Sequence, residues 1–64
     1  MKLTKDTKQL VKPGMYLKDT CDMYEVVGRY EWRNTISLTL RGSDGRVIYG
    51  LPISRCYGMR IIGG

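Results

Sequence analysis

Thr35-Ile36-Ser37-Leu38-Thr39-Leu40-Arg41, followed by Gly42-Ser43-Asp44-Gly45, is the stretch that decides the fold of this chain. In its first part apolar and polar residues alternate strictly, and this period of two is typical of a half-buried β-strand. The apolar set, Ile36, Leu38 and Leu40, should face the core, and the polar set should face outward. The second part contains Asp-Gly, which suits the positive φ angles of a tight hairpin turn. We therefore expect residues 46–51 to form the next strand, antiparallel to residues 35–41.

The rest of the chain also favours strands. It contains no alanine, the best helix former, and it is rich in β-branched and aromatic residues. We expect strands over 15–18, 23–30 and 57–62, a loop over 19–22, a turn over 31–34 and a single helical turn over 53–56. Gly28 indicates a bulge or bend in the strand over 23–30, and Pro52 should end the strand over 46–51. The sequence therefore predicts an all-β fold of five strands.

The expected strand faces define a core. On the strand over 23–30, alternation places Tyr24 and Val26 on the inner face and Glu25, Val27 and Arg29 on the outer face. The predicted core consists of Met15, Leu17, Tyr24, Val26, Ile36, Leu38, Leu40, Val47, Tyr49, Ile53, Met59 and Ile61. A chain of 64 residues makes one domain, and its core is thin because small chains bury a smaller share of their surface.

Charge and composition divide the chain into three parts. Residues 1–12 are polar and lysine-rich, and we expect a basic N-terminal arm whose Leu10–Val11 end contacts the domain. The domain itself should span 13–62, with 63–64 as a glycine tail. Eleven Lys and Arg against six Asp and Glu give a formal net charge of +5. Such an excess favours nucleic acid or an acidic protein surface as partner, and it also serves solubility.

The residue inventory argues against an enzyme or a metalloprotein. There is no histidine, the commonest general base near neutral pH, and the six carboxylates are scattered. Cys21 and Cys56 are too few for a structural zinc site. We therefore predict no catalytic residue, no metal and no cofactor. The absence of a secretory signal or a membrane-length apolar run predicts a cytoplasmic protein with free thiols and no membrane partner.

The order of turns and strands resembles the SH3-like small β-barrel, including its Tudor and KOW-type relatives. The residues that carry the likeness are Val11–Leu17 with its Pro-Gly turn, Tyr24–Val27, Gly42–Gly45 and Gly50–Ser54, and the likeness spans about residues 10–62. The resemblance implies a five-stranded barrel that binds a macromolecular partner. The aromatic signature and acidic loop of the peptide-binding members are missing, so Pro-rich peptide recognition is not implied. An oligonucleotide-binding barrel is the nearest alternative, although such barrels are usually longer.

One cluster of basic and aromatic residues is a candidate binding site. It consists of Arg29, Tyr30, Trp32, Arg33, Thr39, Arg41 and Arg46. Arginine binds phosphate with a planar fork, while tyrosine and tryptophan offer faces on which bases stack. The same residue types are enriched in protein hot spots, and Trp32 could instead close one end of the core.

The sequence therefore predicts a small non-enzymatic binding module. Nucleic acid or a ribonucleoprotein is the expected partner of its basic and aromatic surface. The alternative is an adaptor or inhibitor, of the kind that viruses and plasmids encode, which occupies the surface of another protein. Self-association is a further expectation, because a thin core and β-rich edges favour pairing between copies.

Overall fold

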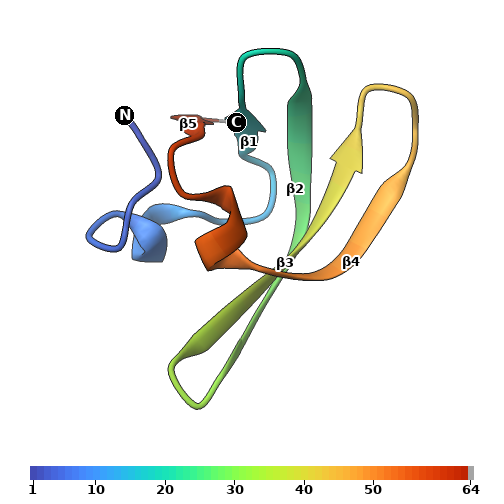
Figure 1. Ribbon diagram of the computed structural model, residues 1–64. Helices are drawn as coiled ribbons and strands as arrows, with labels where there is room; N and C mark the ends of the chain where they lie inside the picture. Colours follow the sequence, from blue (N-terminus) through green and yellow to red (C-terminus); the bar gives the residue numbers. More distant parts are fainter. Residues whose placement is uncertain (64) are drawn as a thin grey trace.

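A computed structural model describes residues 1–63 of the chain, and it shows an all-β fold (Figure 1). In chain order the elements are the 3₁₀-helix η1 (Lys8–Leu10), strands β1 (Tyr16–Lys18), β2 (Met23–Trp32), β3 (Thr35–Gly42) and β4 (Val47–Pro52), the 3₁₀-helix η2 (Ile53–Cys56), and strand β5 (Arg60–Ile62). The expected all-β class, the hairpin turn between β3 and β4 and the helical turn over 53–56 are confirmed.

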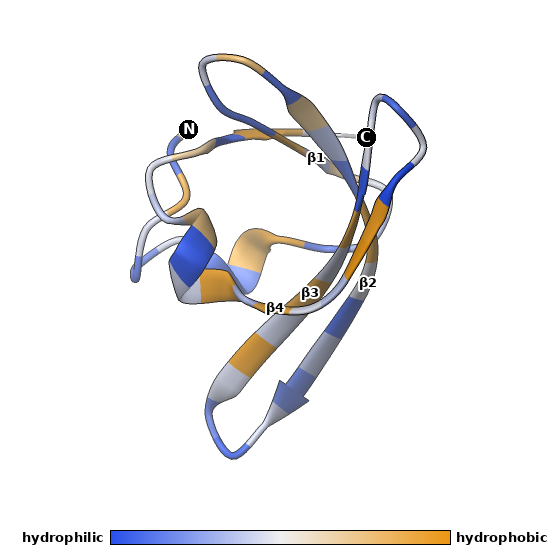
Figure 2. Cartoon of the chain, turned by 45° about the vertical axis from the view of Figure 1, so that its right-hand side comes forward, coloured by the Kyte–Doolittle hydropathy of each residue, from blue (hydrophilic) through white to orange (hydrophobic). Residues whose placement is uncertain are grey.

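The five strands form one antiparallel sheet in the order β4-β3-β2-β1-β5. The sheet curls around the two 3₁₀-helices and the N-terminal segment without closing, an arrangement compatible with a small β-barrel (Figure 2). The far end of the long β2–β3 hairpin extends beyond the curled part (Figure 1). β4 and β5 lie at opposite ends of the strand order, so β4 carries one unpaired edge along the sheet.

The core lies on the inner face of the sheet. Its buried members are Leu3, Val11, Leu17, Val26, Ile36, Leu38, Leu40, Ile53 and Cys56. The inner set of β3 is buried as its alternating pattern predicts. Tyr24, Met59 and Ile61, expected in the core, are only partly buried and pack against it. Met15 is also only partly buried, and it lies just before β1, which begins one residue later than expected.

The first twelve residues are more than the expected arm. Leu3 is completely buried, and so is Val11 at the end that was expected to contact the domain. The Leu3 N–H donates to the Met59 carbonyl and the Ile61 N–H donates to the Met1 carbonyl, each at 2.7 Å. The N-terminal segment thereby covers the outer edge of β5. In so thin a core, one extra leucine is a substantial share of the apolar burial. In the expected glycine tail, Gly63 follows β5 and Gly64 lies outside the described residues.

A bulge in β2 reverses the expected orientation of its second half. Val26 pairs with Leu40 and Gly28 pairs with Thr39, so Val27 is an extra residue without its own partner. The bulge next to Gly28 is confirmed. Because one inserted residue exchanges the two faces of a strand, the residues that follow point the other way. The expectation that Arg29 faces outward is therefore wrong: it pairs with the buried Leu38 on the inner face.

The register of β4, which contains a second bulge, corrects the expectation for this strand. Leu40 pairs with Ile48, but Leu38 pairs with Leu51, so β4 has one extra residue between them. Val47 and Tyr49, expected in the core, are both exposed. The extra residue is accommodated at Gly50, whose φ of +64° glycine adopts more readily than any other residue. Pro52 remains within the strand and is its last residue.

Candidate functional site

Three large aromatic side chains project from the outer face of the sheet. Tyr30 is 63% exposed, Trp32 59% and Tyr49 79%. Tyr30 and Trp32 alternate along β2, where their cross-strand partners are Ser37 and Thr35 on β3. Tyr49 lies on β4 and falls on the same side by alternation with the inward-facing Ile48. We call these three residues the aromatic face.

The outward position of Tyr30 and Trp32 follows from the bulge in β2. Without an extra residue at Val27, alternation from the buried Val26 would turn positions 28, 30 and 32 toward the core. With it, these positions face outward and 29 and 31 face inward. Tyr30 and Trp32 are then about 7 Å apart along the strand, so each ring offers a separate stacking surface.

Arg33 stands at the end of the aromatic face. Its guanidinium carbon lies 5.4 Å from the centroid of the Trp32 ring, within the range of a cation–π contact. Arg33 and Asn34 form a two-residue turn between β2 and β3, and both have positive φ, at 50° and 64°. This geometry fits a type I′ turn, which normally favours Asn-Gly. An arginine at such a position is strained, and strained residues concentrate at functional sites.

Arg29 is separated from the aromatic face because it lies on the inner side of the sheet. Its Nη2 donates to Gln9 Oε1 at 2.9 Å, and its Nη1 lies 3.4 Å from Glu31 Oε1. The Nε atom is buried without a hydrogen-bond partner. The side chain thus ties β2 to η1.

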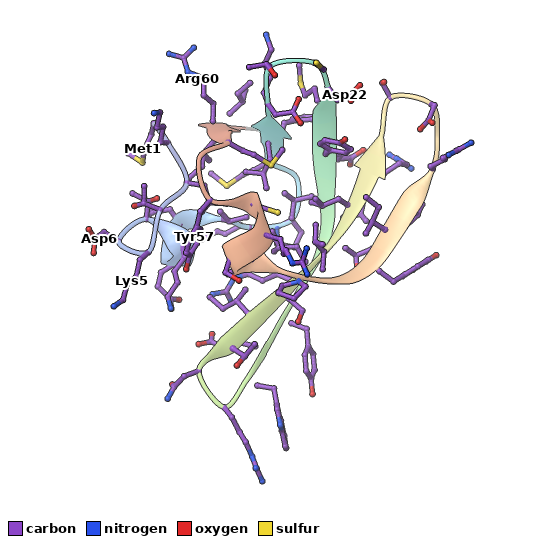
Figure 3. All side chains as sticks on the ribbon, viewed as in Figure 1. Met1, Lys5, Asp6, Asp22, Tyr57 and Arg60 are labelled. Carbon is purple, nitrogen blue, oxygen red and sulfur yellow. The ribbon has the colours of Figure 1, made fainter. Side chains whose placement is uncertain are left out.

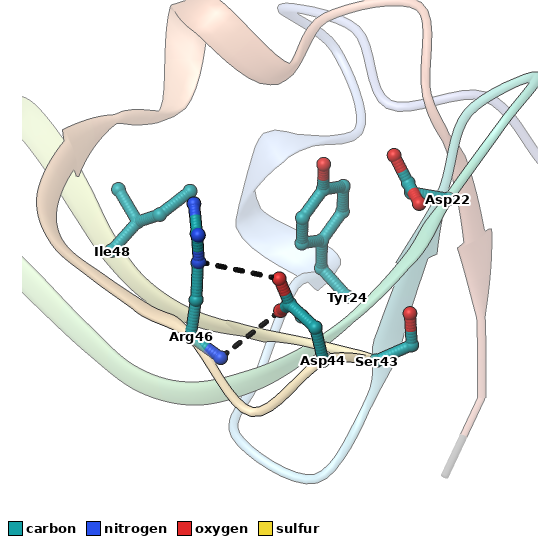
Figure 4. A pocket seen from close by; sticks show the side chains of 7 residues that line it. Asp22, Tyr24, Ser43, Asp44, Arg46 and Ile48 are labelled. Atoms are coloured by element: carbon teal, nitrogen blue, oxygen red, sulfur yellow. Dashed lines mark hydrogen bonds and ion pairs between the residues drawn. The ribbon is translucent and has the colours of Figure 1, made fainter.

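Arg41 and Arg46 already have acidic partners. Arg41 on the outer face forms an ion pair with Glu25, its cross-strand neighbour on β2. Arg46, beyond the β3–β4 turn, has its Nε 3.4 Å from Asp44 Oδ2, and its N–H donates to Asp44 Oδ1 at 3.1 Å (Figure 4). With Arg29, three of the four arginines in the predicted site are therefore paired with a carboxylate.

Arg46 borders a shallow pocket of about 380 Å³ at the turn end of the sheet. Tyr24, Asp22 and Ile48 line the same pocket (Figure 4). Partial burial, together with the nearby Asp22 carboxylate, raises the pKa of Tyr24 above its ordinary value. The pocket carries both signs of charge, from Asp22 and Asp44 and from Arg46.

Thr39 lies on the outer face, half-buried opposite Gly28. A Cβ atom at Gly28 would lie 3.4 Å from Thr39 Cβ, so the glycine leaves the threonine unobstructed. The structure thus gathers Tyr30, Trp32 and Thr39 on one face with Arg33 at its end. Tyr49 was expected in the core, but the hairpin register pairs Ile48 with the inward-facing Leu40 and so turns Tyr49 outward. The available signal was the alternation of β3 carried across the Gly42–Gly45 turn, which places Ile48 and not Tyr49 opposite Leu40.

The structure offers no other chemical centre in the part of the chain that it describes. Within residues 1–63 no three His, Cys, Asp or Glu side chains are grouped as a metal site would require. Over the same residues no helix has the length and apolar character needed to cross a membrane. Cys21 is an exposed free thiol and Cys56 a buried one. Comparison with protein-family models, with curated proteins and with solved structures found no match.

Proposed function

We propose that this protein is a non-enzymatic module that binds single-stranded nucleic acid, alone or within a ribonucleoprotein. The observation that carries the proposal is the aromatic face, on which Tyr30, Trp32 and Tyr49 are each more than half exposed. Base stacking on such side chains contributes about 1–3 kcal/mol per base and tolerates any sequence. Unpaired bases expose the faces that this contact needs, whereas the bases of a duplex are stacked on one another.

Other features support the same function. The outer face carries a row of hydroxyls on β3 at Thr35, Ser37 and Thr39, which can bond to sugars and phosphates. Arg33 adds a cation beside Trp32. The net charge of +5 favours a polyanionic partner. We further propose that the curled sheet is an SH3-like small barrel, and its strand order and the short η2 before the last strand support this assignment.

We place the protein in the cytoplasm, where reducing conditions maintain free thiols such as Cys21 and Cys56. A binding role without catalysis fits a chain that has no histidine and no acid–base pair at its aromatic face. Finding turnover of an oligonucleotide after prolonged incubation would contradict this part of the proposal.

The single tryptophan makes the proposed site its own reporter. Because Trp32 is exposed, its emission in the free protein should resemble that of tryptophan in water. A base that stacks on the ring should quench this emission. We would titrate the protein with random single-stranded and double-stranded oligonucleotides and follow Trp32 fluorescence and the anisotropy of a labelled oligonucleotide. Quenching by single strands, with weaker binding of duplex, is the expected result.

Substitutions test which side chains are responsible. Trp32→Ala and Tyr49→Ala should each weaken single-strand binding by roughly fivefold to 150-fold, the equivalent of one lost stacking contact. Tyr16→Ala removes a less exposed aromatic ring outside the aromatic face and should leave affinity within about twofold. If no oligonucleotide binds even at low salt, or if all three variants behave alike, the aromatic face does not bind nucleic acid.

A protein partner is the second candidate, and a different observation favours it. With Arg29, Arg41 and Arg46 all paired, the aromatic face carries little free positive charge and resembles the hot spot of a protein interface. The neighbouring edge of β4 exposes Val47 and Ile48, and such an edge can receive a strand from another protein or from a second copy. Capture of a partner with little salt dependence, lost in Trp32→Ala, would favour this alternative, and a monomeric mass in sedimentation would exclude self-association.

A further inference from the structure

Three basic side chains stand side by side at the end of the sheet formed by β1 and β5. Arg60 pairs with Lys18 of β1 on one side and with Lys2 of the N-terminal segment on the other. Cross-strand partners project from the same face, with Cβ atoms about 4.5–5.5 Å apart. We call Lys2, Arg60 and Lys18 the basic row.

The backbone forces two of these charges close together. The hydrogen bonds from Leu3 N–H to Met59 O and from Ile61 N–H to Met1 O flank the pair of Lys2 and Arg60. A pair flanked in this way is a non-hydrogen-bonded pair, in which the two side chains approach most closely. Like charges directly opposite each other destabilise a sheet. The basic row therefore opposes folding unless a negative partner neutralises it.

No side chain of the described part of the chain neutralises the row. The ion pairs within residues 1–63 belong to Arg29, Arg41 and Arg46, and none involves the row. The row lines an open groove of about 680 Å³.

Among the described residues that line the groove, Asp19 alone is acidic. Its Oδ1 accepts the N–H groups of Cys21 and Asp22 at 2.8 and 2.6 Å, which engages it in its own loop. Three cations against one such carboxylate leave the groove positively charged.

The basic row is distinct from the aromatic face. Figure 3 shows Arg60 projecting from the upper end of the molecule, whereas the β2–β3 turn, beside the aromatic face, lies at the lower end. The longest dimension of the molecule is 32 Å. A nucleic-acid strand of about ten nucleotides, at roughly 3.4 Å per nucleotide, is long enough to reach from one to the other.

We propose that the basic row is a phosphate-binding site for the backbone of the same nucleic-acid strand whose bases contact the aromatic face. The proposal rests on the proposed function. At the aromatic face Arg41 is paired with a carboxylate, and Arg33 is the only cation in contact with an aromatic ring in residues 1–63. Lys2, Lys18 and Arg60 supply the phosphate contacts that this face lacks, since ammonium and guanidinium groups both donate strongly to phosphate oxygens.

The test compares two double variants that each remove two positive charges. Lys18→Gln/Arg60→Gln disrupts the row, and Lys5→Gln/Lys12→Gln removes two exposed lysines elsewhere. Binding of a single strand of about 20 nucleotides is measured by anisotropy over a salt series. The row variant should bind at least about tenfold more weakly at low salt, and its log–log salt slope should fall by about 1.4, because each lost phosphate contact contributes about 0.7. The control variant should keep the salt slope of wild type. Equal losses of affinity in the two variants would contradict the proposal that the basic row binds phosphate.

Two further measurements separate this proposal from the proposed function. Quenching of Trp32 by a dinucleotide reports the aromatic face alone, because two nucleotides are too short to reach from Trp32 to the row. The row variant should leave that quenching unchanged. Inorganic polyphosphate has no bases, and it should bind wild type and the control but not the row variant. If polyphosphate binds but oligonucleotides do not quench Trp32, the basic row binds phosphate and the aromatic face does not bind bases. If the row variant binds polyphosphate as wild type does, the basic row is not a phosphate-binding site.

Folding of the row variant is checked by thermal unfolding. Because the change removes like-charge repulsion, its midpoint temperature should equal or exceed that of wild type. If the double variant fails to fold, Lys18→Gln alone serves in its place, with Lys12→Gln as its control. A fall in midpoint in that single variant would show that Lys18 stabilises the free protein and is not held there for a ligand.

Discussion

The two faces of the β2–β3 hairpin are built from the same two strands and differ in almost every property. On the inner face Ile36, Leu38 and Leu40 are at most 2% exposed. On the outer face Tyr30 and Trp32 remain more than half exposed. Aromatic side chains can bury 150–250 Å² each, and a domain this small has little other apolar surface to spare. A chain that leaves its largest rings outside its core gives up stability, and this difference is the physical argument for a partner on the outer face.

The largest expected effect comes from placing a charge on the inner face. Leu38→Asp buries an unpaired carboxylate in the centre of the core, where desolvation costs several kcal/mol. A domain of this size has a total stability of roughly 3–10 kcal/mol, so the variant should be unfolded at 25 °C. Far-UV and near-UV circular dichroism would show the loss of both strand and aromatic signals.

The outer face supplies the matched control. Thr35→Asp adds the same charge to the same strand, but on a position that is exposed. This variant should fold, with a stability within about 0.5 kcal/mol of wild type. Native spectra for Leu38→Asp, or unfolding of Thr35→Asp, would contradict the assignment of the two faces of β3.

The sequence predicted β3 well because its alternation is uninterrupted from Ile36 to Leu40. It predicted the faces of β2 less well because that strand contains one extra residue. A bulge changes the side on which every later residue lies, and alternation alone does not reveal it. The sequence therefore placed Arg29 outside, which is wrong. Tyr49 was wrongly placed inside for a different reason: it precedes the β4 bulge, and the hairpin register pairs its neighbour Ile48 with the inward-facing Leu40.

The candidate site was predictable only in part for the same reason. Tyr30 and Trp32 stood out by residue type, and the structure places both on the outer face. The basic row was not predictable from the sequence, since Lys2, Lys18 and Arg60 are distant in the chain and meet only through strand pairing.

Substitutions at the two bulges test the assignment of the two faces through smaller changes in stability. Gly50 has φ +64° and nothing within 4 Å of an added Cβ, so Gly50→Ala should cost about 1–2 kcal/mol through backbone strain alone. Gly28 lacks a positive φ, and its added Cβ would make ordinary contact with Thr39. Gly28→Ala should therefore change stability by less than about 0.5 kcal/mol. Urea unfolding of both variants at pH 7 measures the difference.

The test depends on which of the two substitutions, Gly50→Ala or Gly28→Ala, destabilises the protein more. If Gly28→Ala were the more damaging change, the β2 bulge would have to hold Gly28 in a conformation closed to other residues, and the outward placement of Tyr30 and Trp32 would need revision. Gly50→Ala at wild-type stability would place the extra residue of β4 elsewhere than Gly50.

The smallest expected effect concerns the two thiols, of which Cys21 is exposed and Cys56 is buried. Burial raises the pKa of Cys56, whereas Cys21 is exposed. The folded state therefore keeps the Cys56 proton at a pH where the unfolded chain has lost it. The stabilisation is complete below the pKa of the unfolded thiol and declines as pH rises past about 8.5 through the raised pKa of the folded state.

Two measurements follow the thiols directly. In the native protein a thiol reagent should modify Cys21 quickly and Cys56 only as fast as the domain unfolds. Plotted against pH above about pH 8, the free energy of unfolding should fall more steeply for wild type than for Cys56→Ala, which has no thiol to ionise. Tyr24, whose pKa is also raised, contributes the same sign near pH 10 in both proteins, so it cancels in the comparison. Equal slopes, or equal reaction rates of the two thiols, would place Cys56 outside the core that η2 covers.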